Sequence, residues 1–287
     1  MIFVLFCIRT IQLPAQYRFK LLMIGGWHVG HERIGFLPKT KQWQAIVEEL
    51  QNYDGDISSV SQIATATLDC LRAFYKTIAL DESMIDAVRF LTTLCLSASS
   101  ASQQGYLNSH GFIADDNLSL LSLLQSVNEY IRCETGSLEI NKMIRDSVMQ
   151  ALIDYKQIHE TERLRFIEFE PDNIWRDANK GAAFCEIARS FIAAYTNRQL
   201  RYFLERAAAG SLCDYSQLVL FSKQLTLRAD LISQHTFEIS KLMQSFAAGW
   251  YNKYSAKKLP PDSEISRFLS IVFGKLREEF RRETLES

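Results

Sequence analysis

Amphipathic helical periodicity dominates the sequence and continues with few interruptions from about residue 43 to residue 280. Trp43, Ile46, Val47 and Leu50 fall at i, i+3, i+4 and i+7, so they share one stripe of a helix. Such an apolar stripe has to be buried against other helices. The chain has only 12 Gly and 5 Pro, the residues that interrupt helices and punctuate sheets. We therefore expect an all-α fold, a multi-helix bundle without a strand-rich catalytic core.

The same periodicity, together with capping and turn residues, places the expected helices along the chain. The stripe over 213–254 would form one helix about 60 Å long at 1.5 Å per residue, longer than a compact domain of this size is wide. We expect that helix to project or to break, with Gly249 as the expected break. Asp81 or Ser83, and the pair Ser211 and Asp214, can cap helix starts. The other helices are expected at 41–52, 58–79, 83–98, 117–133, 138–164, 178–208 and 262–284.

Charge is distributed unevenly, although the net charge is only −1. Residues 44–160 hold seven basic and sixteen acidic side chains, whereas residues 223–282 hold eleven basic and six acidic ones. The stretch 165–176, which contains Pro171, is the best candidate for a domain boundary. We therefore expect three parts, namely an irregular or β-like N-terminal arm over 1–40, an acidic helical domain over 41–164 and a basic helical domain over 177–287.

The first residues differ in composition from the rest of the chain. Ile2 to Ile8 is a run of seven apolar residues, but a membrane-spanning helix needs roughly 20 of them. A signal peptide would carry positive charge before its apolar run, and this chain does not. We therefore expect no membrane association. Two interpretations stay open, because the segment either forms two short strands turned by Pro14 or contains an upstream extension, residues 1–22, ahead of a true start at Met23.

The six cysteines are scattered, without the paired spacing of a zinc site or the density of a disulfide framework. We interpret them as reduced thiols of a cytoplasmic protein. The sequence also lacks the GxxxxGK[ST] phosphate loop, a GxGxxG turn after a strand, the GxSxG elbow and the HExxH motif. These absences argue against an ATPase, a dinucleotide enzyme, a serine hydrolase and a zinc protease, so we expect no cofactor.

Three groups of side chains could in principle hold a metal ion. His28, His31 and Glu32 lie in a glycine-rich loop, where they could bind a transition metal or transfer protons. Asp54 with Asp56, and the acidic stretch 168–172, could bind a divalent cation. Close spacing in a loop is unspecific, however, and no sheet is expected to hold the carboxylates. We interpret these residues as parts of loops, turns and linkers, and expect no metal site.

Basic residues gather in the C-terminal region, beside aromatic residues that could stack on bases. Such clusters attract nucleic-acid phosphates, and Trp250, Tyr251 and Tyr254 lie close by in sequence. Glu278 and Glu279 are interleaved at helical pairing distances and would neutralise part of the charge, so a solvated helix face is the competing interpretation. The candidate residues for nucleic-acid or partner binding are Lys253, Lys257, Lys258, Lys275, Arg277, Arg281 and Arg282.

Together these features favour a non-enzymatic helical protein that serves as an accessory or scaffold subunit of a multi-protein assembly. Its expected partners are other protein subunits and DNA or RNA, which it would contact through the basic C-terminal region. Helical proteins of this kind often belong to machines that handle nucleic acid, bacterial defence systems among them.

One pattern supports an enzymatic alternative. Arg228 and His235 are separated by six residues on an expected helix, so two turns place both on one face. This spacing resembles the Arg-x(4–6)-His pattern of the all-helical HEPN ribonucleases, in which the Arg and the His act on the RNA phosphodiester. The resemblance covers these two residues, and Ala229 stands where that family carries a polar residue. It implies a helical ribonuclease with Arg228 and His235 as its catalytic pair.

Overall fold

The computed structural model describes residues 37–132, 137–165, 174–239, 241–255 and 259–286. Over these ranges the protein is all-α, as the sequence predicts, and contains no β-strand. The helices pack around one hydrophobic core. None of them, within the same ranges, is both long and apolar enough to cross a membrane. The N-terminal arm predicted over 1–40 lies outside these ranges except for its last four residues, so both interpretations of it stay predictions.

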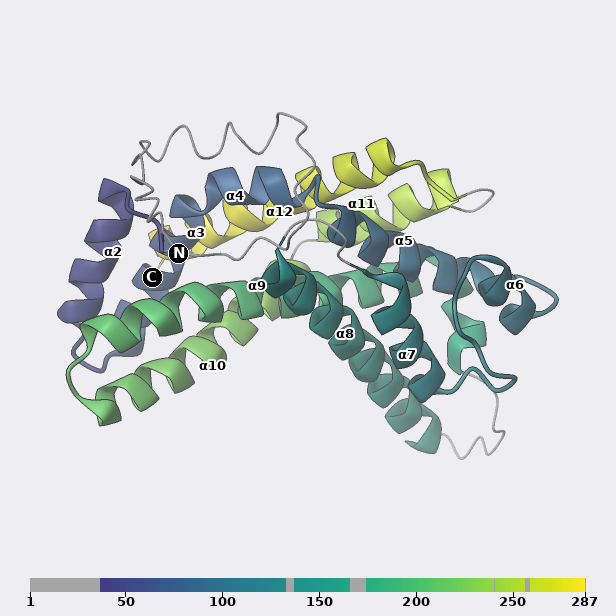
Figure 1. The fold of residues 1–287 in the computed structure, drawn as a ribbon, viewed down its shortest axis with the longest axis horizontal. Helices are drawn as coiled ribbons and strands as arrows, with labels where there is room; N and C mark the ends of the chain where they lie inside the picture. The colour runs from purple at the N-terminus through teal and green to yellow at the C-terminus, as the bar shows by residue number, and fades with distance from the viewer. Residues whose placement is uncertain (1–36, 133–136, 166–173, 240, 256–258, 287) are drawn as a thin grey trace, which may run out of the picture.

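The helices follow one another with short connections, and Figure 1 shows α2 and α6 at opposite ends of the molecule. Most of the bounds lie within three residues of the predicted ones. The elements are α2 (Lys41–Gln51), α3 (Ile57–Cys70), α4 (Arg72–Ile78), α5 (Glu82–Ser97), α6 (Gln103–Ser109), α7 (Leu120–Tyr130), α8 (Leu138–Arg165), the 3-10 helix η1 (Ile174–Asn179), α9 (Gly181–Ser211), α10 (Tyr215–Ile239), α11 (Lys241–Trp250), the π-helical turn η2 (Tyr251–Ser255) and α12 (Asp262–Glu286).

Several helix starts are capped by side chains, as the sequence predicts. Asp81 caps α5, because its Oδ1 accepts a hydrogen bond from the backbone N–H of Met84 at 3.2 Å. Asp214 accepts from the N–H of Ser216 at 3.1 Å, just before α10 begins. The predicted reciprocal pair of Ser211 and Asp214 is wrong, however, because the Ser211 hydroxyl donates to the carbonyl of Ala207 at the end of α9. Ser211 therefore belongs to the preceding helix.

Two predicted segments differ from the observed structure. The helix expected over 58–79 is divided at Leu71 into α3 and α4, and Leu71 itself is buried, with 4% of its surface exposed. The stretch between the helices expected over 83–98 and 117–133, for which no helix is predicted, contains α6. Ser102 caps α6 by accepting from the N–H of Gly105 at 3.0 Å. Gly105 lowers the helix propensity of this polar stretch, and the capping bond compensates.

The long stripe predicted over 213–254 forms α10 and α11, with residue 240 between them outside the described part of the chain. Gly249 does not break the helix, because α11 continues through it to Trp250. The hydrogen-bonding pattern changes two residues later, where the π-helical turn η2 begins at Tyr251. Local widening of this kind redirects the following side chains without ending the helix.

Helix α9 lies at the centre of the fold (Figure 1). It packs against α8 and α10 along its length, and it also contacts α2, α5 and α11. Its buried face carries large side chains, including Phe184, Tyr195 and Phe203, whereas Arg201 and Arg206 on the other face are exposed. Helices from both predicted domains therefore share α9 as a packing partner, and the division into domains stays a prediction.

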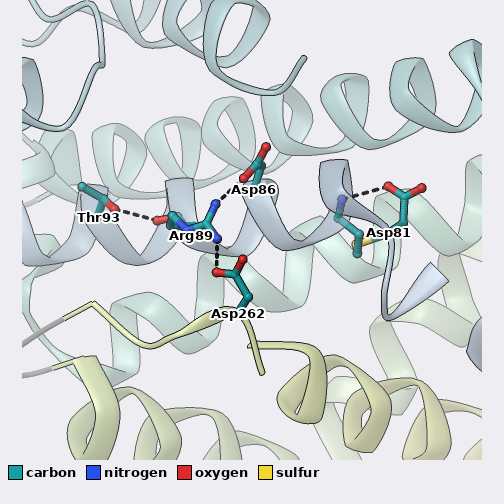
Figure 2. A network of polar contacts seen from close by, with 6 residues as sticks. Asp81, Asp86, Arg89, Thr93 and Asp262 are labelled. Carbon is teal, nitrogen blue, oxygen red and sulfur yellow. Dashed lines mark hydrogen bonds and ion pairs between the residues drawn. The ribbon is translucent and has the colours of Figure 1, made fainter. Parts of the chain in front are cut away.

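Asp81 provides a test of how burial in this fold changes stability with pH. Figure 2 shows its hydrogen bond to Met84, yet desolvation by burial raises the pKa of the Asp81 carboxyl. Folding with the charged carboxylate therefore costs free energy, and this cost disappears as the pH falls through the raised pKa to the ordinary value of 3.8. Because Asn caps helices as well as Asp does, we expect Asp81→Asn to be more stable than the wild type at neutral pH.

Thermal unfolding of both proteins between about pH 3 and pH 7 measures this difference. The advantage of Asp81→Asn should shrink as the pH falls and vanish below 3.8, where Asp81 is neutral in both the folded and the unfolded state. Asp81→Ala serves as the control, since it also removes the charge but loses the cap, so it should be about 1 kcal/mol less stable than Asp81→Asn at every pH. An advantage of Asp81→Asn that stays constant across the range would contradict this assignment.

Candidate nucleic-acid or partner interface

A groove of about 370 Å³ lies between the α11–η2 segment and the first turns of α12. Its lining combines aromatic rings with two basic side chains, Lys253 and Arg267. This is the combination that single-stranded nucleic-acid sites use, because rings stack on bases while cations attract phosphates. The full lining is Ser245, Phe246, Gly249, Trp250, Lys253, Tyr254, Glu264, Arg267, Phe268 and Ile271.

The floor of this basic-aromatic groove is a cluster of packed aromatic rings. The centroids of Trp250 and Phe268 are 4.5 Å apart, and Phe246 lies nearly parallel to Phe268 at 5.7 Å. Below them Phe184 of α9 stacks on Trp250 at 5.6 Å and on Tyr251 at 5.0 Å. Ring pairs at these separations contribute beyond their buried area. The floor is therefore held by the core rather than by the groove's own walls.

The π-helical turn η2 determines which side chains the groove receives. Trp250 and Tyr251 are adjacent in sequence and both are buried, at 6% and 2% exposure. The sequence predicts both to be available for stacking on bases. The prediction is wrong for Tyr251, because its ring packs on Phe184 and does not line the groove. Tyr254 and Lys253 then lie at the opening. Of the three aromatic residues named from the sequence, Tyr254 offers the most accessible ring.

Close packing behind η2 requires a glycine at the start of α9. A Cβ on Gly181 would lie 2.9 Å from the Asn252 side chain and 3.0 Å from the backbone carbonyl oxygen of Ala248. Any other residue there would press against the backbone of α11 at Ala248, and a backbone contact cannot be relieved by rotating a side chain. Gly181 therefore helps to fix the position of the groove.

The electrostatics of the groove favour an anion. Lys253 is exposed, with its Nζ 4.8 Å from the centroid of the Tyr254 ring, an arrangement that keeps the ammonium group beside an aromatic face. Arg267 is also exposed, and Glu264 is the single acidic side chain in the lining. The indole Nε1 of Trp250 is buried and has no hydrogen-bond acceptor among the described residues. The groove thus presents two cations against one carboxylate.

The basic residues predicted from the sequence fall in and beyond this groove. Lys275 lies on α12 one turn beyond Ile271, so it extends the basic row of Arg267 along the helix. Its Nζ forms an ion pair with Glu278 Oε2 at 2.9 Å, which is the solvated pairing that the competing interpretation predicts. Arg277, Arg281 and Arg282 follow on α12, and their side chains lie outside the described part, as do Lys257 and Lys258 altogether.

Arg228 and His235 both lie on α10, as the ribonuclease alternative requires. Arg228 is half-buried, whereas the side chain of His235 is not among those described. The relative positions of the two functional groups are therefore not given by the structure, and the catalytic pair stays a prediction.

The candidate metal ligands have structural roles where the structure describes them. Asp56 caps α3 by accepting from the N–H of Ser58 at 3.3 Å, and Asp54 accepts from the N–H of Asp56 at 3.0 Å. Both carboxylates are thus turn and capping residues, as the sequence predicts. His28, His31, Glu32 and the stretch 168–172 lie outside the described ranges, and no group of three possible ligands occurs within them.

Arg267 and Phe268, which line the groove, do not appear among the residues predicted from the sequence. Their helix is recognisable from its periodicity, but their neighbours on α11 lie about 20 residues earlier, so only the packing of the two helices brings them together. No protein-family model, curated protein or solved structure matches this chain.

Proposed function

We propose that this protein is a non-enzymatic accessory subunit of a multi-protein assembly that contacts single-stranded nucleic acid through the basic-aromatic groove. The observation that carries the proposal is the presence of Lys253 and Arg267 in the lining of a groove whose floor consists of packed aromatic rings. A base entering the groove would pack on Tyr254 and Phe246, and the flanking phosphates would lie near the two cations. Base stacking on aromatic side chains contributes about 1–3 kcal/mol per base.

The basic residues of α12 would continue this contact along the strand. Arg267, Ile271 and Lys275 are spaced by one helical turn, about 5.4 Å, along one side of the helix. A strand lying on this row would meet Lys275 after leaving the groove. The ion pair of Lys275 with Glu278 is exposed and contributes little stability, so a phosphate could replace the carboxylate at small cost.

An exposed apolar stripe on α10 supports the subunit part of the proposal. Tyr215, Val219 and Leu227 are 79%, 49% and 49% exposed, although large apolar side chains are usually buried. Tyr215 and Val219 lie one helical turn apart, and neighbouring exposed apolar side chains are typical of protein–protein contacts. The four described cysteines are free thiols, which fits the proposed cytoplasmic location.

Fluorescence anisotropy with a labelled single-stranded oligonucleotide tests the nucleic-acid contact. We expect the wild type to bind with strong salt dependence, because each neutralised phosphate releases counterions. The triple variant Lys253→Glu, Arg267→Glu and Lys275→Glu should bind about tenfold or more weakly, and the slope of log K against log salt should fall by about 2, at roughly 0.7 per contact.

Lys142→Glu is the control, since Lys142 is an exposed lysine on α8, away from the groove. It should leave the affinity unchanged. Equal binding by the wild type and the triple variant would contradict the proposal, as would a wild type that does not bind. The oligonucleotide should also remain intact during the assay, and RNA cleavage that Arg228→Ala abolishes would instead support the ribonuclease alternative.

A further inference from the structure

A second and larger groove, of about 750 Å³, runs along α9 between α8 and α10. One face of α9, from Glu186 to Arg201, forms its base, and residues 150–158 of α8 form one wall. Asp230 of α10 closes the other side. The volume is in the range of sites that bind small molecules or short peptide segments. We refer to it as the α9 groove.

The carboxylates that line the α9 groove already have hydrogen-bond partners in the protein. Asp154 accepts from Ser190 Oγ at 2.6 Å and from Gln150 Nε2 at 2.8 Å, His159 Nε2 lies 3.2 Å from Glu186 Oε2, and Asn197 Nδ2 donates to Asp230 Oδ1. Such contacts stabilise the negative charges where they are. The acidic side chains of the groove therefore do not need a ligand.

The guanidinium groups are less well satisfied. Arg201 forms an ion pair with Glu205 at 2.8 Å, but Arg189 and Arg198 have no ion pair with any described residue. Arg198 only donates to the carbonyl of Ala194 on its own helix, at 3.2 Å. Desolvation by burial lowers the pKa of Arg198, so its charge is not fully compensated. An anionic group that entered the groove would find two guanidinium groups available for bidentate pairing.

Asn197 adds a second group without a hydrogen-bond partner in the described part of the chain, its side-chain oxygen. Its Nδ2 faces the Asp230 carboxylate, which can only accept, and this contact fixes the orientation of the amide. The Oδ1 atom of Asn197 is then a buried acceptor without a donor among the described residues. A buried acceptor of this kind favours a ligand that brings an N–H group. Phosphates only accept hydrogen bonds, so a phosphate could not satisfy this atom.

We propose that the α9 groove binds an extended acidic peptide segment of a protein partner. Two of its carboxylates would pair with Arg189 and Arg198, and a backbone N–H between them would donate to Asn197. Arg198 follows Arg189 by nine positions on α9, which gives an axial rise of about 13.5 Å at 1.5 Å per residue and a rotation of about 180°, so the two arginines lie on opposite flanks of the groove base. An extended chain covers that distance in about four residues at 3.3 Å each. The expected motif therefore has two acidic residues about four positions apart, and the proposal does not depend on nucleic-acid binding elsewhere.

Fluorescence anisotropy of the full chain with a labelled synthetic peptide tests this site. The peptide carries two glutamates separated by three neutral residues, and a second peptide carries glutamines in their place. We expect the glutamate peptide to bind and the glutamine peptide to lose at least about tenfold in affinity, since charged pairs are the stronger ones. The variant Arg189→Gln/Arg198→Gln should lose a similar factor for the glutamate peptide.

Arg206→Gln is the matched control, because Arg206 lies on α9 but outside the groove and should not affect peptide binding. Circular dichroism checks that each variant is folded. Asn197→Ala leaves both arginines in place, and we expect it to weaken binding of the glutamate peptide as well. The double arginine variant should keep its affinity for the oligonucleotide, which separates this site from the basic-aromatic groove. Equal binding of the two peptides, no binding of either, or displacement of the peptide by the oligonucleotide would overturn the proposal.

Discussion

Replacing Phe184 by Ala is expected to destabilise the fold by about 3–5 kcal/mol, the range for removing a fully buried phenylalanine. Phe184 has no exposed surface and lies in the first turn of α9. Its ring contacts Trp250, Tyr251 and Phe268, with centroids 5.6, 5.0 and 6.1 Å away. The substitution would leave a cavity where α9, η2 and α12 meet.

Urea denaturation of the wild type and of Phe184→Ala measures this loss as a change in the midpoint. Leu121→Ala is the control, since Leu121 is 68% exposed on α7 and its removal should change stability by less than about 0.5 kcal/mol. Phe184→Ala should also weaken oligonucleotide binding, because the Phe184 ring packs against Trp250 and Phe268, which form the floor of the basic-aromatic groove. A loss of less than about 1 kcal/mol would show that the ring stack is not a core element.

Most helices of this fold could be predicted from the sequence, because burial imposes a 3.6-residue period that survives in the residue types. The bounds of α2 and α5 agree with the prediction within one residue, and Asp81 was recognisable as a cap from its position alone. The predictions that failed concern short elements. α6 has seven residues, too few for a periodic pattern, and its first turn is capped by the bond from the Gly105 N–H to Ser102 Oγ.

The division of α3 from α4 could not be predicted for a different reason. Residues 58–79 have no Gly or Pro, so nothing local ends the helix. Leu71, Tyr75 and Ile78 are all buried, but their spacing at i, i+4 and i+7 would place them on one face of an unbroken helix as well, so this pattern gives no sign of the division. Tertiary packing overrides propensity at such positions.

The two grooves show which candidate binding residues the charge count of a sequence region can reveal and which it cannot. Lys253 was recognisable as a candidate because it lies in a basic stretch. Arg189 and Arg198 were not, because residues 161–222 hold eight basic and eight acidic side chains and appear neutral as a region. Only the structure shows that the carboxylates in the α9 groove have hydrogen-bond partners other than Arg189 and Arg198. Charge balance along a sequence therefore says little about which charges are compensated in space.

Arg89→Ala is the second substitution with a large expected effect. Figure 2 shows Arg89 of α5 between Asp86 on the same helix and Asp262 at the start of α12, with ion pairs to both. Arg89 and Asp86 are only 22% and 19% exposed, so the pair is largely shielded from water. Desolvation already raises the pKa of Asp86, and the positive charge of Arg89 opposes this effect. Removing the guanidinium group would leave the Asp86 carboxylate largely buried without its cation.

We expect Arg89→Ala to cost about 2–3 kcal/mol at neutral pH, less than the roughly 3–5 kcal/mol for a fully buried pair, because some solvent reaches these groups. The loss should shrink as the pH falls, since the pKa of Asp86 would rise further without Arg89 and protonation would remove the uncompensated charge. Urea denaturation at several pH values measures both effects.

Three matched variants identify which contact of Arg89 matters. Asp262→Ala should cost less than about 1 kcal/mol, because Asp262 is 70% exposed and its pair with Arg89 is screened by water. Arg89→Ala/Asp86→Asn should be more stable than Arg89→Ala, because the neutral amide no longer needs a cation. The stability of Arg89→Lys should lie between those of the wild type and Arg89→Ala. One ammonium group cannot pair with both carboxylates as the planar guanidinium group does. If the double variant were no more stable than Arg89→Ala, the loss would come from missing packing of the arginine stem, not from an uncompensated carboxylate.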